Sequence, residues 1–260
     1  MYNKFDENCK IIYNKRIQSN YFELKIKMIR AHRYCHPGQF FMISIPGVFL
    51  RRPFGVCRID DKKGHVIFLY KVVGRGTEIL SRITHGTIKL LGPLGKNYNI
   101  KIFNNGDTVD SRSGFNNIVV AGGTGISSVY FLVSKLKNNG ILYYGARSKS
   151  DLLYLNNFSK LGWKTVLSTE DGSAGYKGYI TDLLCKELNN KSVIFVCGPI
   201  SMVKKTLCIA KSKNIDGFVS VEEKMACGCG NCQGCVINVN GQNKKVCKDG
   251  PVFRIKDIEL

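Results

Sequence analysis

Apolar and polar residues alternate in short runs through the first hundred positions of the chain. Residues 21–29 place an apolar side chain at every second position, which is the period of a strand with one buried face. Further apolar runs at residues 39–45, 65–73 and 88–91 are separated by turns that contain glycine or proline. Several short strands at this spacing predict a small antiparallel β-barrel over residues 1–102.

The pattern changes in the middle of the chain. Buried-type strands now alternate with stretches of helical periodicity, which predicts a parallel sheet with crossover helices over residues 103–215. Residues 103–117 are polar and without a period, so we expect a linker or an exposed loop there. Residues 216–260 form a short cysteine-rich tail. The expected fold is therefore a multidomain β plus α/β protein with a small C-terminal module.

The cysteines of the tail have a distinctive spacing. Cys227, Cys232 and Cys235 are separated by four and then two residues, and Cys247 follows after a short gap. This is the C-x4-C-x2-C…C pattern of plant-type iron–sulfur proteins, in which four thiolates hold a [2Fe–2S] cluster. Glycines suit a loop around a cluster, because they tolerate positive φ and let backbone N–H groups approach the sulfurs. The glycines between these cysteines are Gly228, Gly230 and Gly234.

Two other uses of the same cysteines stay open. A structural zinc site also takes four cysteines, commonly as C-x2-C pairs, and Cys229, Cys232 and Cys235 repeat at three-residue intervals. A disulfide knot is the third option. The x4 and x2 spacing favours the iron–sulfur interpretation, in which Cys229 is a bystander inside the loop.

Composition narrows the class of protein without identifying an activity. The 260 residues are 44% hydrophobic, which is enough for well-formed cores, and they carry a formal net charge of +20. The basic residues are spread along the chain, as on a solvated surface. We therefore expect no nucleic-acid partner, and the charge favours phosphate-bearing ligands and a negatively charged protein partner.

The distribution of apolar residues and the N-terminal sequence indicate where in the cell the protein acts. No apolar run reaches the ~18 residues that span a bilayer, and the polar N-terminus does not resemble a signal peptide. We therefore expect a cytoplasmic protein without membrane attachment, whose cysteines are reduced thiols and cluster ligands rather than disulfides.

A glycine-rich turn follows the first strand of the predicted parallel sheet. Such a turn lets the backbone approach a pyrophosphate, which then sits at the N-terminus of the following helix. Ser128 stands where the dinucleotide-binding fingerprint has its third small residue. A turn that is merely tightly packed is the alternative. The residues of the turn are Gly122, Gly123, Thr124 and Gly125.

Two further segments bear on the nucleotide. The acidic residue usual at the end of the second strand is missing, and Arg147 near that position would suit a 2′-phosphate, so NADP stays open beside NAD. Cys197, Gly198 and Pro199 follow a predicted strand, and open α/β sheets bind ligands at the carboxyl ends of their strands. An inert core cysteine is the alternative for Cys197.

The barrel offers a second candidate site. A guanidinium matches phosphate oxygens, and the ring of a neighbouring phenylalanine can lie against a flavin. Gly76 and Thr77 add backbone and hydroxyl donors. Taken without the other domains, an exposed arginine and a core phenylalanine explain the pattern equally well. The run concerned is Arg52, Pro53, Phe54 and Gly55.

Taken in order, these motifs resemble the ferredoxin reductase superfamily. The tail, residues 222–253, is similar to that of the electron-transfer subunits of type B dihydroorotate dehydrogenases. The resemblance spans nearly the whole chain, and the tail is its most specific part. It implies an FAD-binding barrel, an NAD-binding α/β domain and a C-terminal [2Fe–2S] module. The matching segments are residues 37–40, 52–55, 76–77, 92–95, 122–125 and 197–202.

The resemblance also implies site residues. FAD would be held by Arg52, Pro53, Phe54, Gly55, Leu69, Tyr70, Lys71, Gly76 and Thr77. NAD would be received by Gly122, Gly123, Thr124, Gly125, Cys197, Gly198 and Pro199. The cluster ligands would be Cys227, Cys232, Cys235 and Cys247. One departure concerns Gly55, because the family usually has Ser or Thr there, with a hydroxyl expected near the flavin N5.

The implied function is electron transfer in pyrimidine biosynthesis. Electrons from an FMN-containing catalytic subunit that oxidises dihydroorotate would pass through the [2Fe–2S] cluster and FAD to NAD+, in a heterotetramer with two copies of each subunit. Hydride transfer at the flavin needs no acid or base, so we expect no catalytic residue. The nearer alternative is a small flavin/iron–sulfur subunit of another NAD(P)H:ferredoxin or sulfide-type oxidoreductase. The remoter one is a zinc module that binds nucleic acid.

Overall fold

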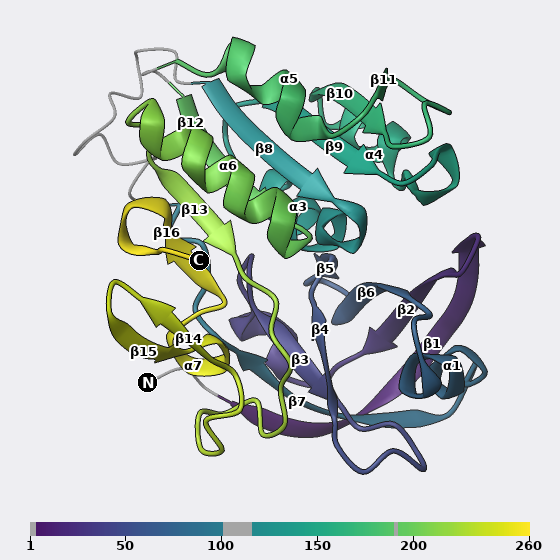
Figure 1. The fold of residues 1–260 in the computed structure, drawn as a ribbon. Coiled ribbons are helices and arrows are strands. Elements are labelled where there is room, and N and C mark those ends of the chain that lie inside the picture. Colours follow the sequence, from purple (N-terminus) through teal and green to yellow (C-terminus); the bar gives the residue numbers. More distant parts are fainter. Residues whose placement is uncertain (1–3, 101–115, 190–191) are drawn as a thin grey trace.

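Two seven-stranded sheets dominate the computed structural model of the protein, which describes residues 4–100, 116–189 and 192–260 (Figure 1). The first sheet has the strand order β4-β3-β7-β1-β2-β6-β5, and its neighbours pair antiparallel. Its elements are β1 (Phe5–Gln18), β2 (Tyr21–Lys27), η1 (Ala31–Tyr34), β3 (Phe40–Ile43), β4 (Arg52–Gly55), β5 (Arg58–Asp60), β6 (His65–Lys71), α1 (Arg75–Ser81) and β7 (Thr87–Leu94).

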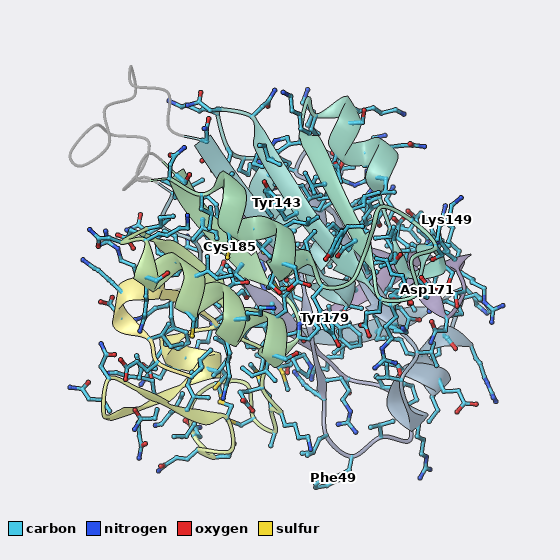
Figure 2. The ribbon with its side chains drawn as sticks, turned by 45° about the horizontal axis from the view of Figure 1, so that its top comes forward. Phe49, Tyr143, Lys149, Asp171, Tyr179 and Cys185 are labelled. Atoms are coloured by element: carbon cyan, nitrogen blue, oxygen red, sulfur yellow. The ribbon has the colours of Figure 1, made fainter. Side chains whose placement is uncertain are left out.

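The predicted barrel forms because this sheet curls on its own apolar face. Strand β4 packs against β6 although the two are not neighbours in the sheet. The rings of Phe41 and Phe54 lie edge-on to Phe68, with centroids 5.9 and 6.5 Å away. Aromatic rings prefer this edge-to-face contact, and the three rings fill the inside of the barrel. Phe49, by contrast, is wholly exposed in the loop between β3 and β4, at the end of the barrel far from the second sheet (Figure 2).

The second sheet confirms the predicted parallel α/β domain. Its order is β11-β10-β9-β8-β12-β13-β16, and all pairings are parallel except that of β16 with β13. The strands are β8 (Asn116–Gly122), β9 (Gly140–Ala146), β10 (Lys164–Thr169), β11 (Tyr176–Lys177), β12 (Ser192–Cys197), β13 (Gly217–Ser220) and β16 (Val252–Arg254).

Helices cover both faces of this sheet, as crossover connections require. Val119 and Ala121 of β8 pack toward α3 and α4, whereas Ile118 and Val120 pack toward α5 and α6. Successive side chains of a strand point to opposite faces, so a strand buried on both sides reads as a continuous apolar run. The helices are α3 (Ile126–Val133), α4 (Leu155–Lys160), α5 (Ile180–Glu187) and α6 (Ile200–Ser212), with the short turns η2 (Gly123–Gly125) and η3 (Lys149–Asp151).

The tail leaves this sheet and returns to it. After β13 the chain forms the hairpin β14 (Val236–Val239) and β15 (Gln242–Lys245), then α7 (Val246–Asp249), and then β16 re-enters the sheet beside β13, with η4 (Ile255–Asp257) after it. The sequence pattern did not predict β13 or β16, because each strand is short and is defined by pairing with a strand far away in the sequence. The expected linker at residues 103–117 lies mostly outside the described residues, and its last two positions belong to β8.

Polar contacts fasten the barrel to the α/β domain. Asp151 accepts hydrogen bonds from the Tyr21 hydroxyl at 2.8 Å and from Lys71 Nζ at 2.9 Å. Glu23 of β2 accepts a hydrogen bond from the hydroxyl of Tyr154, which precedes α4. These contacts fix the two sheets relative to one another. No helix among the described residues has both the length and the apolarity needed to cross a bilayer.

Candidate functional site

The tail cysteines gather where the loop between β13 and β14 meets α7. Cys227, Cys232 and Cys235 lie on the loop or at its end, and Cys247 lies on α7. The backbone N–H of Cys232 donates to Cys227 Sγ at 3.5 Å, and that of Cys247 donates to Cys235 Sγ at 3.4 Å. The four predicted ligands are thus arranged as two pairs, one within the loop and one joining the end of the loop to the helix.

The two pairs lie in different surroundings. Cys235 and Cys247 are only 3% and 2% exposed, whereas Cys232 is exposed and Cys227 is half-buried. Burial opposes ionisation of Cys227, yet the N–H groups of Cys232 and Cys229 lower its pKa to about 6. Burial and the neighbouring Cys235 thiol raise the pKa of Cys247 to about 12. One pair therefore faces the surface and the other faces the core.

Pairs of thiols suit a two-iron centre. Within the described ranges, no three His, Cys, Asp or Glu side chains gather around a point where they could hold a single metal ion. A [2Fe–2S] cluster instead takes two protein ligands on each of its two irons. The donor set, four thiols in two pairs, therefore fits the cluster that the spacing predicted.

Glycines shape the loop as expected, with one difference. Gly228 and Gly230 have φ of +69° and +91°, and a Cβ on Gly228 would lie 2.5 Å from Met42 Cγ. The loop therefore packs directly on β3 of the barrel. Gly234 is not in the positive-φ region, and Gln233 adopts it instead, with φ of +58°. Cys229 also contacts Cys227, because its thiol and backbone N–H lie within hydrogen-bonding reach of the Cys227 sulfur, so its exclusion from the two pairs rests on the sequence spacing.

A cavity of about 260 Å³ opens on the barrel beside this loop. Two of the residues expected to hold FAD, Arg52 and Gly76, stand outside its wall but next to each other, because a Cβ on Gly76 would lie 3.4 Å from Arg52 Nε. The other expected residues line the cavity and are Pro53, Phe54, Gly55, Leu69, Tyr70, Lys71 and Thr77.

The opposite wall of the barrel cavity comes from elements that sequence reasoning did not include. Ser127 and Ser128 of α3 line it, as do Glu222 and Met225 at the start of the cysteine loop. The Ser127 hydroxyl is buried and, among the described residues, has no nitrogen or oxygen partner; only the weakly bonding Cys57 thiol lies within reach, so it can bind a polar group of a ligand. This wall could not be found locally, because it depends on how the α/β domain packs against the barrel.

A larger cleft, of about 730 Å³, lies at the carboxyl ends of the parallel strands. Five of the residues predicted to receive NAD line it. The other two, Gly125 and Cys197, support the wall from behind, because a Cβ on Gly125 would lie 2.3 Å from the Cys197 carbonyl oxygen. Tight packing also accounts for Gly122 and Gly198, whose Cβ atoms would lie 2.6 Å from Pro199 Cδ and 2.7 Å from Met202 Cε, whereas among the described residues a Cβ on Gly123 would meet nothing within 4 Å. The five lining residues are Gly122, Gly123, Thr124, Gly198 and Pro199.

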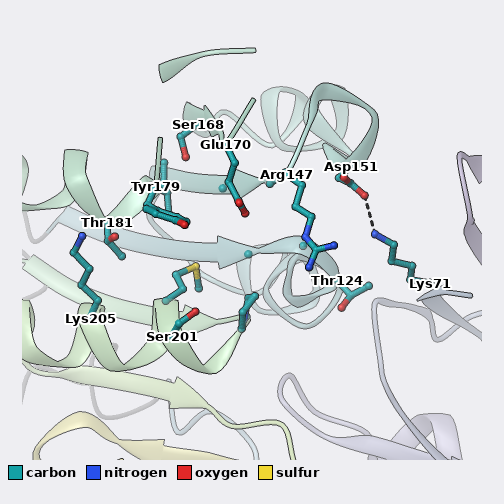
Figure 3. Close-up of a pocket in the computed structure, with 18 of the residues that line it drawn as sticks. Lys71, Thr124, Arg147, Asp151, Ser168, Glu170, Tyr179, Thr181, Ser201 and Lys205 are labelled. Atoms are coloured by element: carbon teal, nitrogen blue, oxygen red, sulfur yellow. Dashed lines mark hydrogen bonds and ion pairs between the residues drawn. The ribbon is translucent and has the colours of Figure 1, made fainter. Parts of the chain in front are cut away.

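Two charged residues lie at the far end of this cleft, and only Arg147 had been named from the sequence. Arg147, from the end of β9, and Glu170, from the end of β10, both reach into it (Figure 3). The sequence indicated no acidic residue at the second strand, and the structure supplies one from the third. The rule that ligands bind at the carboxyl ends of strands would have identified Glu170, since it directly follows β10.

The two cavities meet at a shared boundary. Lys71, Val73, Thr124 and Glu222 line both of them. Glu222 is exposed to solvent where it borders the two cavities, and the protein around it raises the pKa of its carboxyl by desolvation. Burial, and to a smaller degree the charge of Glu222, raise the pKa of Cys197 to about 12, so this thiol stays neutral. A ligand in the barrel cavity would therefore contact a ligand in the cleft.

The barrel cavity is also joined to the cysteine pairs. Phe40 lines the cavity and shares one hydrophobic cluster with Cys235 and Cys247. Met225 lines the cavity and packs against that same cluster. The buried thiol pair is thus separated from the cavity by packed side chains rather than by solvent.

Comparison with known proteins follows this division of the chain. Residues 222–259 match the family described as the iron–sulfur cluster binding domain of dihydroorotate dehydrogenase B, and residues 119–207 match the oxidoreductase NAD-binding domain. A solved structure of an NADH-dependent reduced ferredoxin-NADP oxidoreductase is similar with a TM-score of 0.81 and 28% identity, over 96% of this chain and 89% of that one. A ferredoxin NADP+ reductase from Neisseria gonorrhoeae, at 14% identity and a TM-score of 0.66 over 80% of this chain and 91% of that one, shares the fold.

Two relatives that match over nearly their whole length share the same name. A protein of Clostridium acetobutylicum is 36% identical over 94% of this chain and 93% of its own length, and one of Fusobacterium nucleatum is 33% identical over 98% of both. Each is named as the electron transfer subunit of dihydroorotate dehydrogenase B (NAD(+)). With this identity over nearly its whole length, and with the cysteine pairs, barrel cavity and nucleotide cleft in place, the chain belongs to the family of dihydroorotate dehydrogenase B electron transfer subunits.

Proposed function

We propose that this protein relays electrons from a dihydroorotate-oxidising catalytic subunit to NAD+. The observation that carries the proposal is the order of three adjoining sites: a surface-facing thiol pair, a barrel cavity behind it, and a nucleotide cleft that shares a wall with the cavity. When bound, a [2Fe–2S] cluster carries single electrons and FAD holds two, so together they connect one-electron transfer with hydride transfer to NAD+.

The thiol pairs divide the work of holding the cluster. Cys235 and Cys247 would anchor it against the apolar core, and Cys227 and Cys232 would present it to the partner. N–H groups aimed at the sulfurs, such as that of Gly234 on Cys232 Sγ at 3.4 Å, stabilise thiolate charge and so favour cluster binding. The exposed pair defines the face on which the partner docks.

The barrel residues would bind and orient FAD. Arg52 and the turn at Gly76 and Thr77 stand together at the edge of the barrel cavity and suit the pyrophosphate, since guanidinium and backbone N–H groups pair with phosphate oxygens. Phe54 and Gly55 would border the ring, with Ser127 opposite as a polar contact. No side chain is assigned as acid or base.

The cleft would hold NAD through its backbone and one carboxylate. Gly122, Gly123 and Thr124 would lie along the pyrophosphate, and Gly198 and Pro199 along the nicotinamide half. Glu170 would accept hydrogen bonds from the ribose hydroxyls, and its negative charge would disfavour a 2′-phosphate. We therefore propose NAD rather than NADP as the acceptor.

The partner would be an FMN-containing catalytic subunit, with two copies of each chain in the complex. Functional segments would be residues 1–102 for FAD, 103–215 for NAD and 216–260 for the cluster, although β13 and β16 of the last segment complete the sheet of the second. The cytoplasm is the proposed location, because that compartment keeps eleven cysteines reduced.

The decisive experiment is an absorption spectrum of the anaerobically purified full chain, with iron, acid-labile sulfide, zinc and flavin analysis. We expect flavin bands over a broad iron–sulfur envelope, with FAD stoichiometric to the protein. A colourless protein that contains zinc would overturn the proposal. Mixing the chain with its catalytic subunit and offering dihydroorotate or reduced ferredoxin as the electron donor would separate this function from that of a ferredoxin oxidoreductase.

A further inference from the structure

Gly55 and Ser128 occupy complementary space across the boundary between the two domains. Gly55 ends β4 in the barrel, and Ser128 lies in the first turn of α3 in the α/β domain. A Cβ built on Gly55 would lie 2.8 Å from Ser128 Oγ, and among the described residues it would meet no other atom within 4 Å, apart from those of its chain neighbours. The backbone of Gly55 is not in the positive-φ region. A side chain at this position would therefore have to displace the Ser128 hydroxyl by rotation about χ1.

Gly55 and Ser128 each differ from the residue type that the sequence motif around them leads us to expect. Gly55 stands where a hydroxyl-bearing residue was expected, and Ser128 stands where the dinucleotide-binding fingerprint has its third small residue. The structure brings these two departures into contact. The expected hydroxyl is absent at position 55, and Ser128 supplies a hydroxyl to the same space.

The surroundings of Ser128 place it where ligands of the two cavities would meet. Ser128 and Gly55 both line the barrel cavity. The Ser128 hydroxyl also lies within hydrogen-bonding reach of the Cys197 thiol, at the end of the strand that leads into Gly198 and Pro199 of the nucleotide cleft. Hydride can pass only where the two ligands touch, so this hydroxyl faces the reacting side of the barrel cavity.

We propose that the Ser128 hydroxyl, carried on the α/β domain, is the side-chain hydrogen-bond donor to the reacting edge of the flavin ring, in place of a side chain at position 55. The inference rests on the proposed function, because it requires FAD in the barrel cavity. Ser128 is thus a flavin-positioning residue that belongs to the nucleotide-binding domain. Its hydroxyl is delivered by α3, so the contact depends on the packing of that domain against the barrel.

The test uses the full chain and four variants. Ser128→Ala removes the donor, Gly55→Ser adds a competing side chain, and the double variant Gly55→Ser/Ser128→Ala moves the hydroxyl from one domain to the other. Ser134→Ala is the matched control, because Ser134 lies just after the same helix and its hydroxyl bonds the Phe131 carbonyl at 2.8 Å, outside both cavities. The readouts are the dissociation constant of FAD by fluorescence and the midpoint potential and visible bands of the bound flavin.

We expect Ser128→Ala to weaken FAD binding by about tenfold, which corresponds to about 1.4 kcal/mol, and to shift the flavin potential and bands, while Ser134→Ala matches the wild type. Gly55→Ser alone should also weaken binding, because its Cβ meets Ser128 Oγ. The double variant should return FAD affinity to within about threefold of wild type.

Two results would overturn the inference. One is a Ser128→Ala protein whose FAD affinity, potential and bands equal those of Ser134→Ala. The other is a double variant no better than Ser128→Ala, which would mean that the two positions do not share one role. A wild-type chain that binds no FAD at all would instead defeat the proposed function, and so the two failures can be told apart.

Discussion

At the scale of single residues, two opposite charges among those that line the nucleotide cleft bear on the choice of nucleotide. Arg147 and Glu170 reach into it from adjacent strands, and they would prefer different nucleotides. A guanidinium attracts a 2′-phosphate, whereas a carboxylate accepts hydrogen bonds from ribose hydroxyls and repels the phosphate. The choice between NAD and NADP therefore depends on which charge lies nearer the ribose, and we assign that place to Glu170.

Replacing Glu170 by Gln should relax the choice of nucleotide. Removing the negative charge keeps one acceptor for the ribose but ends the repulsion of a 2′-phosphate. The ratio of kcat/KM for NADH to that for NADPH, measured with an artificial electron acceptor, should fall by about tenfold, or about 1.4 kcal/mol. Asp171→Asn is the control, because this neighbouring carboxylate lies outside the cleft and bonds Ser173. An unchanged ratio in Glu170→Gln would contradict the assignment.

The cysteine loop offers a second test with a built-in control. Cys232→Ser removes one thiolate of the exposed pair and should lose most bound iron and sulfide. Cys229→Ser changes a cysteine of the same loop that lies outside the pairs, and should keep the cluster. Iron and sulfide content and the visible spectrum of the two proteins decide the matter. Iron retained by the first variant and lost by the second would show that the ligand set is wrong.

At the scale of elements, partly buried polar contacts join the barrel to the α/β domain. Tyr21 and Lys71, at the start of β2 and the end of β6, converge on Asp151 at the end of η3. Lys71 also lines both cavities, so the contact that joins the domains lies beside both ligand sites. Weakening this contact should affect stability and ligand binding together.

Asp151→Asn should therefore destabilise the protein in a pH-dependent way. Burial favours the protonated acid, but hydrogen bonds from Lys71 and Tyr21 outweigh it and lower the pKa of Asp151. A lowered pKa stabilises the fold above the unfolded value of about 3.9 and loses that effect as pH falls through the folded value. We expect a loss of about 1–2 kcal/mol in unfolding free energy at pH 7.

Urea unfolding of wild type and variant between pH 3 and pH 7 measures this difference. The gap between the two proteins should narrow as the pH falls below about 4. Asp257→Asn, at an exposed carboxylate near the C-terminus, is the control and should change little at any pH. A gap that is constant over the whole range would mean that the charge of Asp151 does not contribute.

Local pattern predicted most elements and the residues carried on them. The strand period of β2 and the continuous apolar run of β8 are properties of neighbouring residues, and both strands were found where predicted. The spacing of Cys227, Cys232 and Cys235 is equally local, and their role as ligands stays a prediction. Ser127, Ser128 and Glu222 were missed as cavity residues, because they face the barrel only after the domains dock. The strands β13 and β16 were missed for the same reason, since pairing partners far apart in sequence define them.

At the scale of the whole molecule, the order of sites limits what the chain can do alone. The nucleotide cleft and barrel cavity adjoin, so NADH should reduce the bound flavin without any partner. Dihydroorotate oxidation is assigned to the partner subunit, so the isolated chain should not turn over that substrate. Under the proposed function, a complete relay would require the second subunit at the exposed thiol pair.

The two activities, NADH oxidation by this chain and dihydroorotate oxidation by its partner, can be tested separately. The isolated chain should transfer electrons from NADH to a dye at full rate, and should reduce no NAD+ when dihydroorotate is supplied. Adding the catalytic subunit should restore the second reaction in proportion to complex formed. Turnover of dihydroorotate by the isolated chain would show that it contains a substrate site of its own.

The placement of β16 beside β13 has a consequence for how the protein matures. The cysteine loop leaves the second sheet at one strand and comes back at the next, and Cys247 lies just before the return. During synthesis the fourth thiol emerges twelve residues after the third, and β16 follows it, so the pocket for iron can close only after β16 has paired with β13. Insertion of the inorganic centre accordingly follows the closing of the sheet, and a messenger truncated shortly before codon 247 would remove the fourth thiol together with β16, so iron retention and the edge of the nucleotide-binding sheet would fail together.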